Sequence, residues 1–172
     1  MIHVVGARGT ISDIDEFLQK LSQFATKEQI SIQALNADAV YGAQHLISAA
    51  EHALRSFAQG TNATNTLPLE IMLYAAGERQ IQKAIKKMGV KTGRQAIAFV
   101  IVDQKRKKDE KSEFMIKRLL TLFDMTSDES VLGGNPITLK NFGITQKELR
   151  TVPKEKYGDL ILEKVAMVDV QK

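Results

Sequence analysis

Two glycines near the start of the sequence lie where a nucleotide-binding loop could form. Gly6 and Gly9 fall between an expected strand and an expected helix, where glycine lets backbone N–H groups approach an anion. The dinucleotide pattern needs three spaced glycines and the Walker pattern needs Gly-Lys before Ser or Thr, and neither occurs. We favour a plain tight turn at Gly6–Gly9. The alternative function is an enzyme that binds a nucleotide or phosphorylated metabolite at this turn and uses Asp103.

Two histidines are candidate metal ligands. His45 and His52 are seven residues apart in an expected helix over 42–58, so they lie on nearly the same side, with backbones about 10 Å apart. That distance is too long for one metal ion. Both fall opposite the apolar stripe of the helix, which predicts that they face solvent or a partner.

The acidic residues also have structural explanations. The carboxylate pairs Asp13/Asp15 and Asp109/Glu110 fall at a helix start and in a loop, where helix capping and solubility account for them. The spacing shows no recognisable Ser/His/Asp arrangement. The absence of Cys excludes disulfides, thiol catalysis and Cys-ligated zinc or iron–sulfur sites. We therefore expect no catalytic residue, no metal site and no cofactor.

The basic residues are concentrated in one part of the sequence. Residues 79–118 hold 13 Lys/Arg against four Asp/Glu, a net charge of +9, whereas the rest carries −5. Such a block indicates a polyanionic partner, although a solvated face would look the same. In an expected helix over 78–88, one side carries Arg79, Lys83, Lys86 and Lys87, and the other carries Ile81, Ala84, Ile85 and Met88. Four cations on one stripe fit the phosphates of a nucleic acid, and such binding weakens steeply with salt.

Hydrophobic periodicity predicts the elements that position these residues. Strands are expected at 2–7, 29–35 and 96–102, with a further one at 131–139. Helices are expected at 12–26 (with Ser12 as cap), 42–58, 67–76, 78–88, 111–123 and after Pro153, and Thr145 with Glu148 forms a capping-box pattern. Gln104–Lys111 is expected to be a charged loop. These elements predict an α+β fold, with a small mixed or antiparallel sheet and several helices, in one domain spanning 1–172.

The expected helix 67–76 is unusual because it is apolar nearly all round. Only Glu70 and Tyr74 interrupt its apolar surface, and they lie one turn apart on the same side. Such a helix is either buried on all sides or covers a partner.

Length and composition narrow the class of protein. The 172 residues suit one sizeable core. The longest wholly apolar run, at 96–102, is far too short to span a membrane. No signal peptide is evident at the start, and we expect a cytoplasmic protein.

Three stretches carry a resemblance to a known family. They are ALNADAVYGAQHLISAAEHALRSFAQGTN at 34–62, NTLPLEIMLYAAGERQIQKAIKKMGV at 65–90, and the segment 144–168, which begins ITQKELRTV. With them in view, the sequence resembles the small kinase-binding subunit of the KEOPS tRNA-modification complex, the TPRKB family, in its archaeal form. The middle stretch is the most specific, because its family positions are occupied by Asn65, Leu67, Glu70, Tyr74, Gly77, Arg79, Gln80 and Ile81.

The resemblance implies a non-enzymatic partner of a small atypical kinase/ATPase, in a complex that installs threonylcarbamoyladenosine in tRNA. Archaeal members are implied to grip the tRNA 3′ CCA end, and other KEOPS subunits would be reached through the kinase. No membrane or DNA partner is expected. A third hypothesis is an interaction subunit whose basic stripe is only solubilising. The residues expected to bind RNA are Arg8, Asn62, Asn65, Arg79, Gln80, Lys83, Lys86 and Lys87; those expected to bind the kinase are Leu69, Met72 and Leu73.

Overall fold

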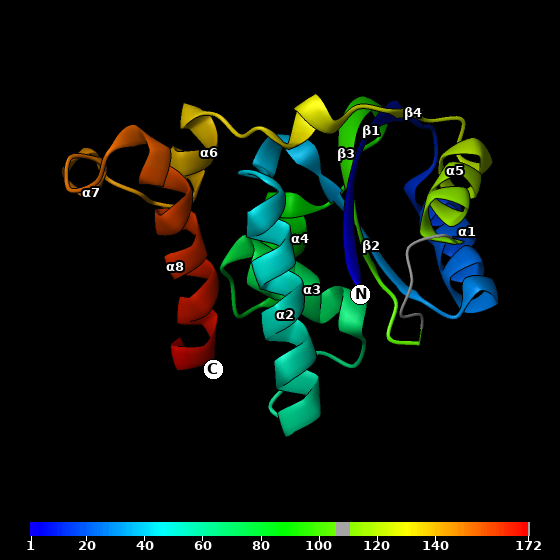
Figure 1. Cartoon of the computed structure of the whole chain (residues 1–172), viewed down its shortest axis with the longest axis horizontal. Coiled ribbons are helices and arrows are strands. Elements are labelled where there is room, and N and C mark those ends of the chain that lie inside the picture. The colour runs from blue at the N-terminus through cyan, green and yellow to red at the C-terminus, as the bar shows by residue number, and fades with distance from the viewer. Residues whose placement is uncertain (106–110, 172) are drawn as a thin grey trace.

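The fold is built on a four-stranded antiparallel sheet with helices on both faces (Figure 1). The structure is a computed structural model, and it describes residues 1–105 and 111–171. The strand order is β2-β3-β1-β4. The strands are β1 (Ile2–Ile11), β2 (Ser31–Asn36), β3 (Gly93–Val102) and β4 (Thr126–Ser127). The predicted α+β class is therefore confirmed.

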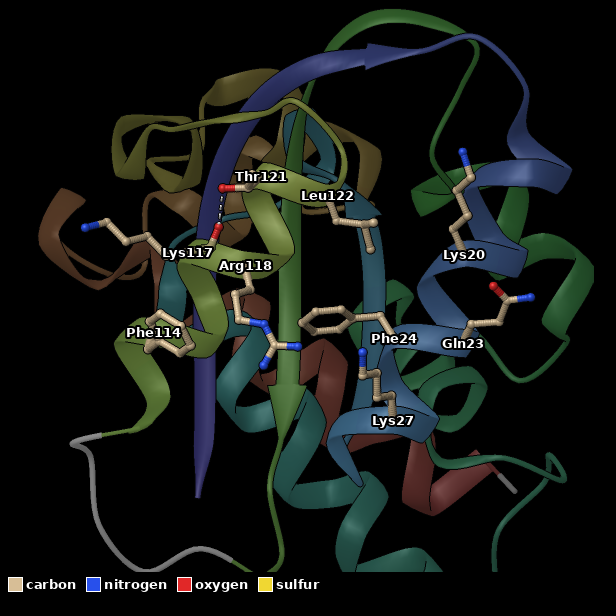
Figure 2. Close-up of a pocket in the computed structure, with 9 residues that line it drawn as sticks. All are labelled: Lys20, Gln23, Phe24, Lys27, Phe114, Lys117, Arg118, Thr121 and Leu122. Carbon is tan, nitrogen blue, oxygen red and sulfur yellow. Dashed lines mark hydrogen bonds between the residues drawn. The ribbon is translucent and has the colours of Figure 1, made fainter.

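The helices divide between the two faces of the sheet (Figure 1). One face is covered by α2 (Ala43–Gln59) and α3 (Leu67–Ala76). Helix α4 (Ile81–Met88) packs against α3, and α8 (Tyr157–Gln171) packs against α2 and α3 on the side away from the sheet. The other is covered by α1 (Ile14–Glu28) and α5 (Ser112–Leu122), and Figure 2 shows these two helices from close by. The remaining short helices are η1 (Ala37–Ala39), η3 (Glu129–Leu132), α6 (Pro136–Asn141), α7 (Gln146–Leu149) and η4 (Lys154–Lys156).

Strand β3 supplies both hydrophobic cores. Val100 packs into the core beneath α2 and α3, while Phe99 and Ile101 pack into the core beneath α1 and α5. Successive strand side chains point to opposite faces, and both faces here are covered. A strand buried on both faces must be apolar throughout, which explains the continuous run at 96–102.

Several predicted elements and contacts are confirmed by the structure. Helix α3 has the predicted bounds, and Thr145 and Glu148 form the predicted capping box at α7.

Helix α1 is capped by Asp13 instead of the predicted Ser12, because the Asp13 carboxylate accepts a 3.0 Å hydrogen bond from the Glu16 N–H. Of the charged loop predicted at 104–111, residues 106–110 lie outside the described residues.

The strand predicted at 131–139 is wrong. This region forms η3 and then α6. The Asn135 side chain accepts a hydrogen bond from the Thr138 N–H, and Pro136 occupies the first turn. An Asn cap followed by Pro strongly favours a helix start, and this local preference outweighs the apolar residues that suggested a strand.

The predicted tight turn at Gly6–Gly9 is also wrong, because β1 runs without interruption from Ile2 to Ile11. Both glycines sit in the ladder, with Gly6 opposite Ala98 and Gly9 opposite Gln95. A Cβ atom on Gly9 would lie 2.5 Å from Met125 Cγ. The glycines therefore let the segment containing β4 pass close over β1.

Among the described helices, none combines the length and apolar character needed to cross a bilayer.

Candidate nucleic-acid interface

Helix α3 lies in the core. Residues 70–76 are all buried, and Met72 and Leu73 are only 5% and 1% exposed. They pack in the core that also contains α2, α4 and α8. The helix is apolar nearly all round because the chain itself surrounds it. Met72 and Leu73, predicted to contact a kinase, are core residues with almost no accessible surface, whereas Leu69 is half-buried.

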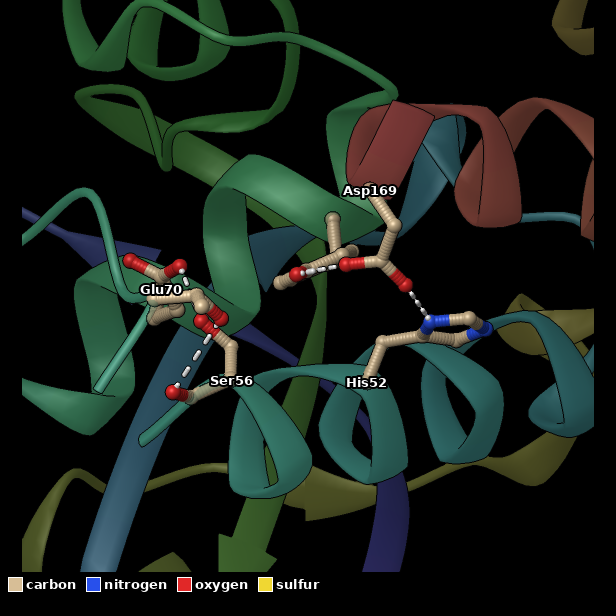
Figure 3. A network of polar contacts seen from close by, with 6 residues as sticks. His52, Ser56, Glu70 and Asp169 are labelled. Carbon is tan, nitrogen blue, oxygen red and sulfur yellow. Dashed lines mark hydrogen bonds and ion pairs between the residues drawn. The ribbon is translucent and has the colours of Figure 1, made fainter. Parts of the chain in front are cut away.

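A buried carboxylate on α3 fixes the loop 61–66 that joins α2 to α3. Glu70 is fully buried, and its carboxylate accepts hydrogen bonds from the Ser56 hydroxyl at 3.0 Å and the Ala63 N–H at 3.1 Å. It also accepts hydrogen bonds from the Thr64 N–H at 2.9 Å and the Thr64 hydroxyl at 2.7 Å. Figure 3 shows Glu70 facing Ser56 across α2 and α3. A buried carboxylate needs such partners, so Glu70 is a positioning residue for the loop.

The loop carries two of the residues predicted to bind RNA, and they differ in role. Asn62 is half-buried, and its side-chain NH2 donates a 2.9 Å hydrogen bond to the Thr64 carbonyl. Asn65 is exposed. Asn62 therefore shapes the loop, while the Asn65 amide faces the surface.

A hollow of about 250 Å³ brings the loop together with Arg79. It is lined by Thr61, Ala63, Leu73, Arg79 and Val168. Arg79 and Gln80 are both exposed, and Gln80, which precedes α4, makes no side-chain capping hydrogen bond. The structure thus brings the Arg79 cation beside the loop, with Val168 of α8 also lining the hollow. Asn65 and Gln80 are exposed but do not line it.

The predicted basic stripe of α4 is shorter than expected. Lys83 and Lys86 are exposed, and so is Ile85, which was expected to face the core but is 48% exposed. Lys87 turns toward the protein: its Nζ donates a 2.7 Å hydrogen bond to the Ala76 carbonyl and lies 4.0 Å from the centre of the Phe142 ring. Burial lowers the pKa of Lys87, although nearby Glu78 opposes the shift. The exposed stripe therefore consists of Lys83 and Lys86, beside Arg79.

His45 belongs to the core, so the prediction that it faces solvent or a partner is wrong. It is 1% exposed. The Tyr41 N–H donates to its Nδ1 at 3.1 Å, so the proton lies on Nε2, which donates to the Ala75 carbonyl at 2.7 Å. Burial and, to a smaller extent, neighbouring Lys87 lower the pKa of His45 to about 4, although the hydrogen bond to the Ala75 carbonyl opposes the shift. His45 and Lys87 together satisfy carbonyls at the C-terminal end of α3.

His52 connects α2 to α8 of the same chain. Its Nδ1 lies 2.7 Å from the Asp169 carboxylate, and its ring stacks on Tyr74 with 5.4 Å between ring centres. The same carboxylate accepts a short hydrogen bond from the Tyr74 hydroxyl. Figure 3 shows Asp169 reaching from α8 toward His52. These contacts hold α8 beside the hollow that Val168 lines.

Arg8 lies in a different hollow from Arg79. Its side chain is exposed on β1, and its Nε donates a 2.7 Å hydrogen bond to the Asp128 carboxylate. Hydrogen bonds from Ser130 and Arg8 lower the pKa of Asp128. Arg8 and Arg94 line a hollow of about 570 Å³ that the loop 61–66 does not reach. The structure therefore does not group Arg8 with the other predicted RNA contacts.

The structure does not form the alternative nucleotide site, which required a loop at Gly6–Gly9 and an accessible Asp103. Gly6 and Gly9 form no loop, and Asp103 is 3% exposed and accepts a hydrogen bond from the Lys105 N–H at 3.0 Å. Residues 1–105 and 111–171 hold no cluster of three or more His, Cys, Asp or Glu side chains that could bind a metal ion.

Sequence reasoning missed the contributions of Glu70 and α8 to this interface. The only signal for Glu70 was an acidic residue in an otherwise apolar helix. Such a residue needs hydrogen-bond partners if it is buried, but the sequence does not identify them. Val168 and Asp169 reach the interface only through tertiary packing of α8 against α2 and α3.

Comparison with known protein families identifies a match that covers most of the chain. Residues 10–169 match the family model of the kinase binding protein CGI-121. A search of curated proteins found no match.

Proposed function

The chain belongs to the CGI-121 family of kinase binding proteins, and we propose that it is the non-catalytic kinase-binding subunit of a KEOPS complex. In this role it binds and regulates the small atypical kinase/ATPase of the complex and recruits tRNA by its 3′ CCA end for threonylcarbamoyladenosine synthesis. It reaches the other subunits through the kinase and acts in the cytoplasm as one domain. Of the residues predicted to contact the kinase, Leu69 remains a candidate because it keeps accessible surface.

The observation that supports tRNA recruitment is the grouping of Arg79 with the loop that Glu70 holds. An unpaired RNA end exposes both phosphates and base edges. Lys83, Lys86 and Arg79 supply exposed cations for the phosphates, and the exposed amides of Asn65 and Gln80 supply donors and acceptors for the base edges. Asn62 acts indirectly, since its amide is engaged within the loop.

Binding to intact tRNA and to the same tRNA without its CCA end tests the proposal. We expect binding only to intact tRNA. Three cation–phosphate contacts with a single strand give a salt slope of about −2, so affinity should fall about 20-fold from ~50 to ~200 mM salt. Reversing two charges in Lys83→Glu/Lys86→Glu should weaken binding at least about tenfold at low salt. Equal binding to both RNAs would contradict recruitment through the CCA end.

A matched control variant distinguishes the effect of Lys83 and Lys86 on tRNA affinity from the effect of the overall net charge. Lys147→Glu/Lys154→Glu makes the same change in net charge at exposed positions on α7 and η4. We expect this variant to bind tRNA nearly as tightly as the unchanged chain, because long-range effects of exposed charges are screened by salt. If both variants lose the same affinity, the stripe is a nonspecific polyanion surface.

A further inference from the structure

Another, larger hollow lies on the other face of the sheet, between α1 and α5. It measures about 750 Å³, against about 250 Å³ for the hollow beside Arg79. Figure 2 shows Phe24 of α1 and Arg118 of α5 pointing toward one another between the two helices, with Lys117 on the outer edge of α5. It is lined by Lys20, Gln23, Phe24, Lys27, Phe114, Lys117, Arg118, Thr121 and Leu122. We call it the α1–α5 groove.

The groove exposes apolar side chains of α5. Phe114 is 67% exposed and Leu122 is 48% exposed, while Phe24 forms the deeper floor at 8%. The Arg118 guanidinium lies 5.8 Å from the ring centres of both Phe24 and Phe114. Exposed Phe and Leu side chains around one hollow are a feature of protein-binding sites, because covering them removes apolar surface from water.

The groove also has a single sign of charge. All of its charged lining residues are basic: Lys20 and Lys27 on α1, and Lys117 and Arg118 on α5. Arg118 is paired with Glu28 at 2.7 Å and Lys20 with Glu16 at 2.6 Å. In the part of the chain that the structure describes, Lys27 and Lys117 form no ion pair, and they come from opposite walls. An occupant with carboxylates on both of its flanks would satisfy them.

We propose that the α1–α5 groove binds an acidic amphipathic helix of a partner protein. Apolar side chains of such a helix at positions i, i+4 and i+7 would cover Phe24, Phe114 and Leu122. Acidic side chains on its flanks would reach Lys27 on one wall and Lys117 on the other, which gives the complex its electrostatic complementarity. The incoming helix would form a third helix on this face of the sheet.

The arrangement of charge favours a protein over RNA. A nucleic-acid strand needs cations along its phosphates and open aromatic faces for its bases. Here the basic side chains come from two helices, with apolar side chains between them. Phe24 is buried, and the Arg118 guanidinium lies close to the rings of both Phe24 and Phe114, so neither ring offers an open face to a base. The groove is also on the opposite face of the sheet from α4 (Figure 1), so its occupant would leave Lys83 and Lys86 accessible.

A designed peptide serves as the probe. It is a fluorescent helix of about 18 residues, long enough to span the groove, with Leu along one stripe and Glu on both flanks. One control peptide replaces each Glu by Gln, and another replaces each stripe Leu by Ser. We expect saturable binding of the acidic amphipathic peptide to the full chain, and at least about tenfold weaker binding of both controls.

Variants of the chain locate the binding. Phe114→Ser and Lys27→Glu/Lys117→Glu should each weaken the peptide complex at least about tenfold while leaving tRNA binding unchanged. These side chains are exposed, so the fold tolerates both changes. Lys83→Glu/Lys86→Glu should do the reverse, weakening tRNA binding alone. This reciprocal result separates the groove from the proposed tRNA site, so failure of one leaves the other standing.

Four results would overturn the proposal. The first is the absence of saturable peptide binding up to ~1 mM, and the second is peptide binding that the groove variants leave unchanged. The third is displacement of the labelled peptide by oligouridine more readily than by unlabelled peptide. The fourth is self-association of the chain that Phe114→Ser abolishes. The third would assign the groove to RNA, and the fourth would assign it to a second copy of the chain.

Discussion

Replacing Glu70 by Gln removes the negative charge that holds the loop 61–66 while changing little of its volume. The carboxylate accepts hydrogen bonds from the Thr64 N–H and hydroxyl, the Ala63 N–H and the Ser56 hydroxyl. A Gln side chain presents one oxygen and one NH2 group. If the Gln oxygen replaces Oε2, it keeps the hydrogen bonds from Thr64 and one from the Ala63 N–H, but the NH2 group then meets the Ala63 N–H donor to donor. In the opposite orientation, the NH2 group leaves the Thr64 N–H without its acceptor.

The expected cost follows from that mismatch. An N–H that faces the NH2 group in the half-buried loop costs about 1–2 kcal/mol, and weakening the remaining charge-assisted hydrogen bonds adds about 1–2 kcal/mol. We therefore expect Glu70→Gln to lower the free energy of unfolding by about 2–4 kcal/mol. Hydrogen exchange should show faster exchange of the Ala63 and Thr64 amides than of the core strand amides, because the loop opens locally before the sheet does.

Two measurements check this reasoning. Urea denaturation gives the change in stability, and exchange measured residue by residue shows where it acts. Glu51→Gln, an exposed change on α2, is the matched control and should stay within about 0.5 kcal/mol of the unchanged chain. A Glu70→Gln variant as stable as this control, with unaltered exchange at 63 and 64, would refute the positioning role of Glu70.

Other predictions concern the contacts around α3. Lys87→Met should lower the free energy of unfolding by about 1–2 kcal/mol in urea denaturation, because it removes the hydrogen bond to the Ala76 carbonyl. It should reduce tRNA affinity less than Lys86→Met does, and equal losses of affinity would show that Lys87 contacts the RNA. His45 has its pKa lowered from 6.5 to about 4, so between these pH values the unfolded imidazole is protonated and the folded one is not. The stability that the neutral His45 ring contributes is therefore present above pH 6.5 and is lost as the pH falls to about 4. The free energy of unfolding should decrease by about 3 kcal/mol over this window, and His45→Gln should lack this part of the pH dependence. Asp169→Asn should speed hydrogen exchange in α8 because its contacts with His52 and Tyr74 weaken; unchanged protection would show that apolar packing alone holds α8.

Sequence patterns predict best where local chemistry decides the structure. Pro68 near the start and Gly77 at the end define α3, and the left-handed φ of 64° at Gly77 explains why glycine ends it there. The capping box at Thr145 and the continuous apolar run of β3 are equally local signals. For this reason the α+β class and most helices could be predicted.

The failures arise where two structures share one local pattern. An apolar helix surrounded by its own chain and one that covers a partner have the same composition, so the sequence could not identify Met72 and Leu73 as core. His45 and Lys87 look exposed by helical angle, but tertiary packing directs both toward the carbonyls that end α3. Phe114 and Leu122 are a further case, because an apolar residue in an amphipathic helix does not by itself show whether the chain covers it, and here the chain leaves both exposed.

We have proposed that this chain joins a kinase to tRNA, and a sedimentation experiment with the chain, the kinase and tRNA tests this proposal. The chain, the KEOPS kinase and intact tRNA are mixed and compared with mixtures that lack the chain or contain tRNA without its CCA end. We expect a ternary complex only in the full mixture. The Lys83→Glu/Lys86→Glu variant should still bind the kinase but should not form the ternary complex. Displacement of the kinase by tRNA, or a ternary complex that survives removal of the CCA end, would contradict the proposal.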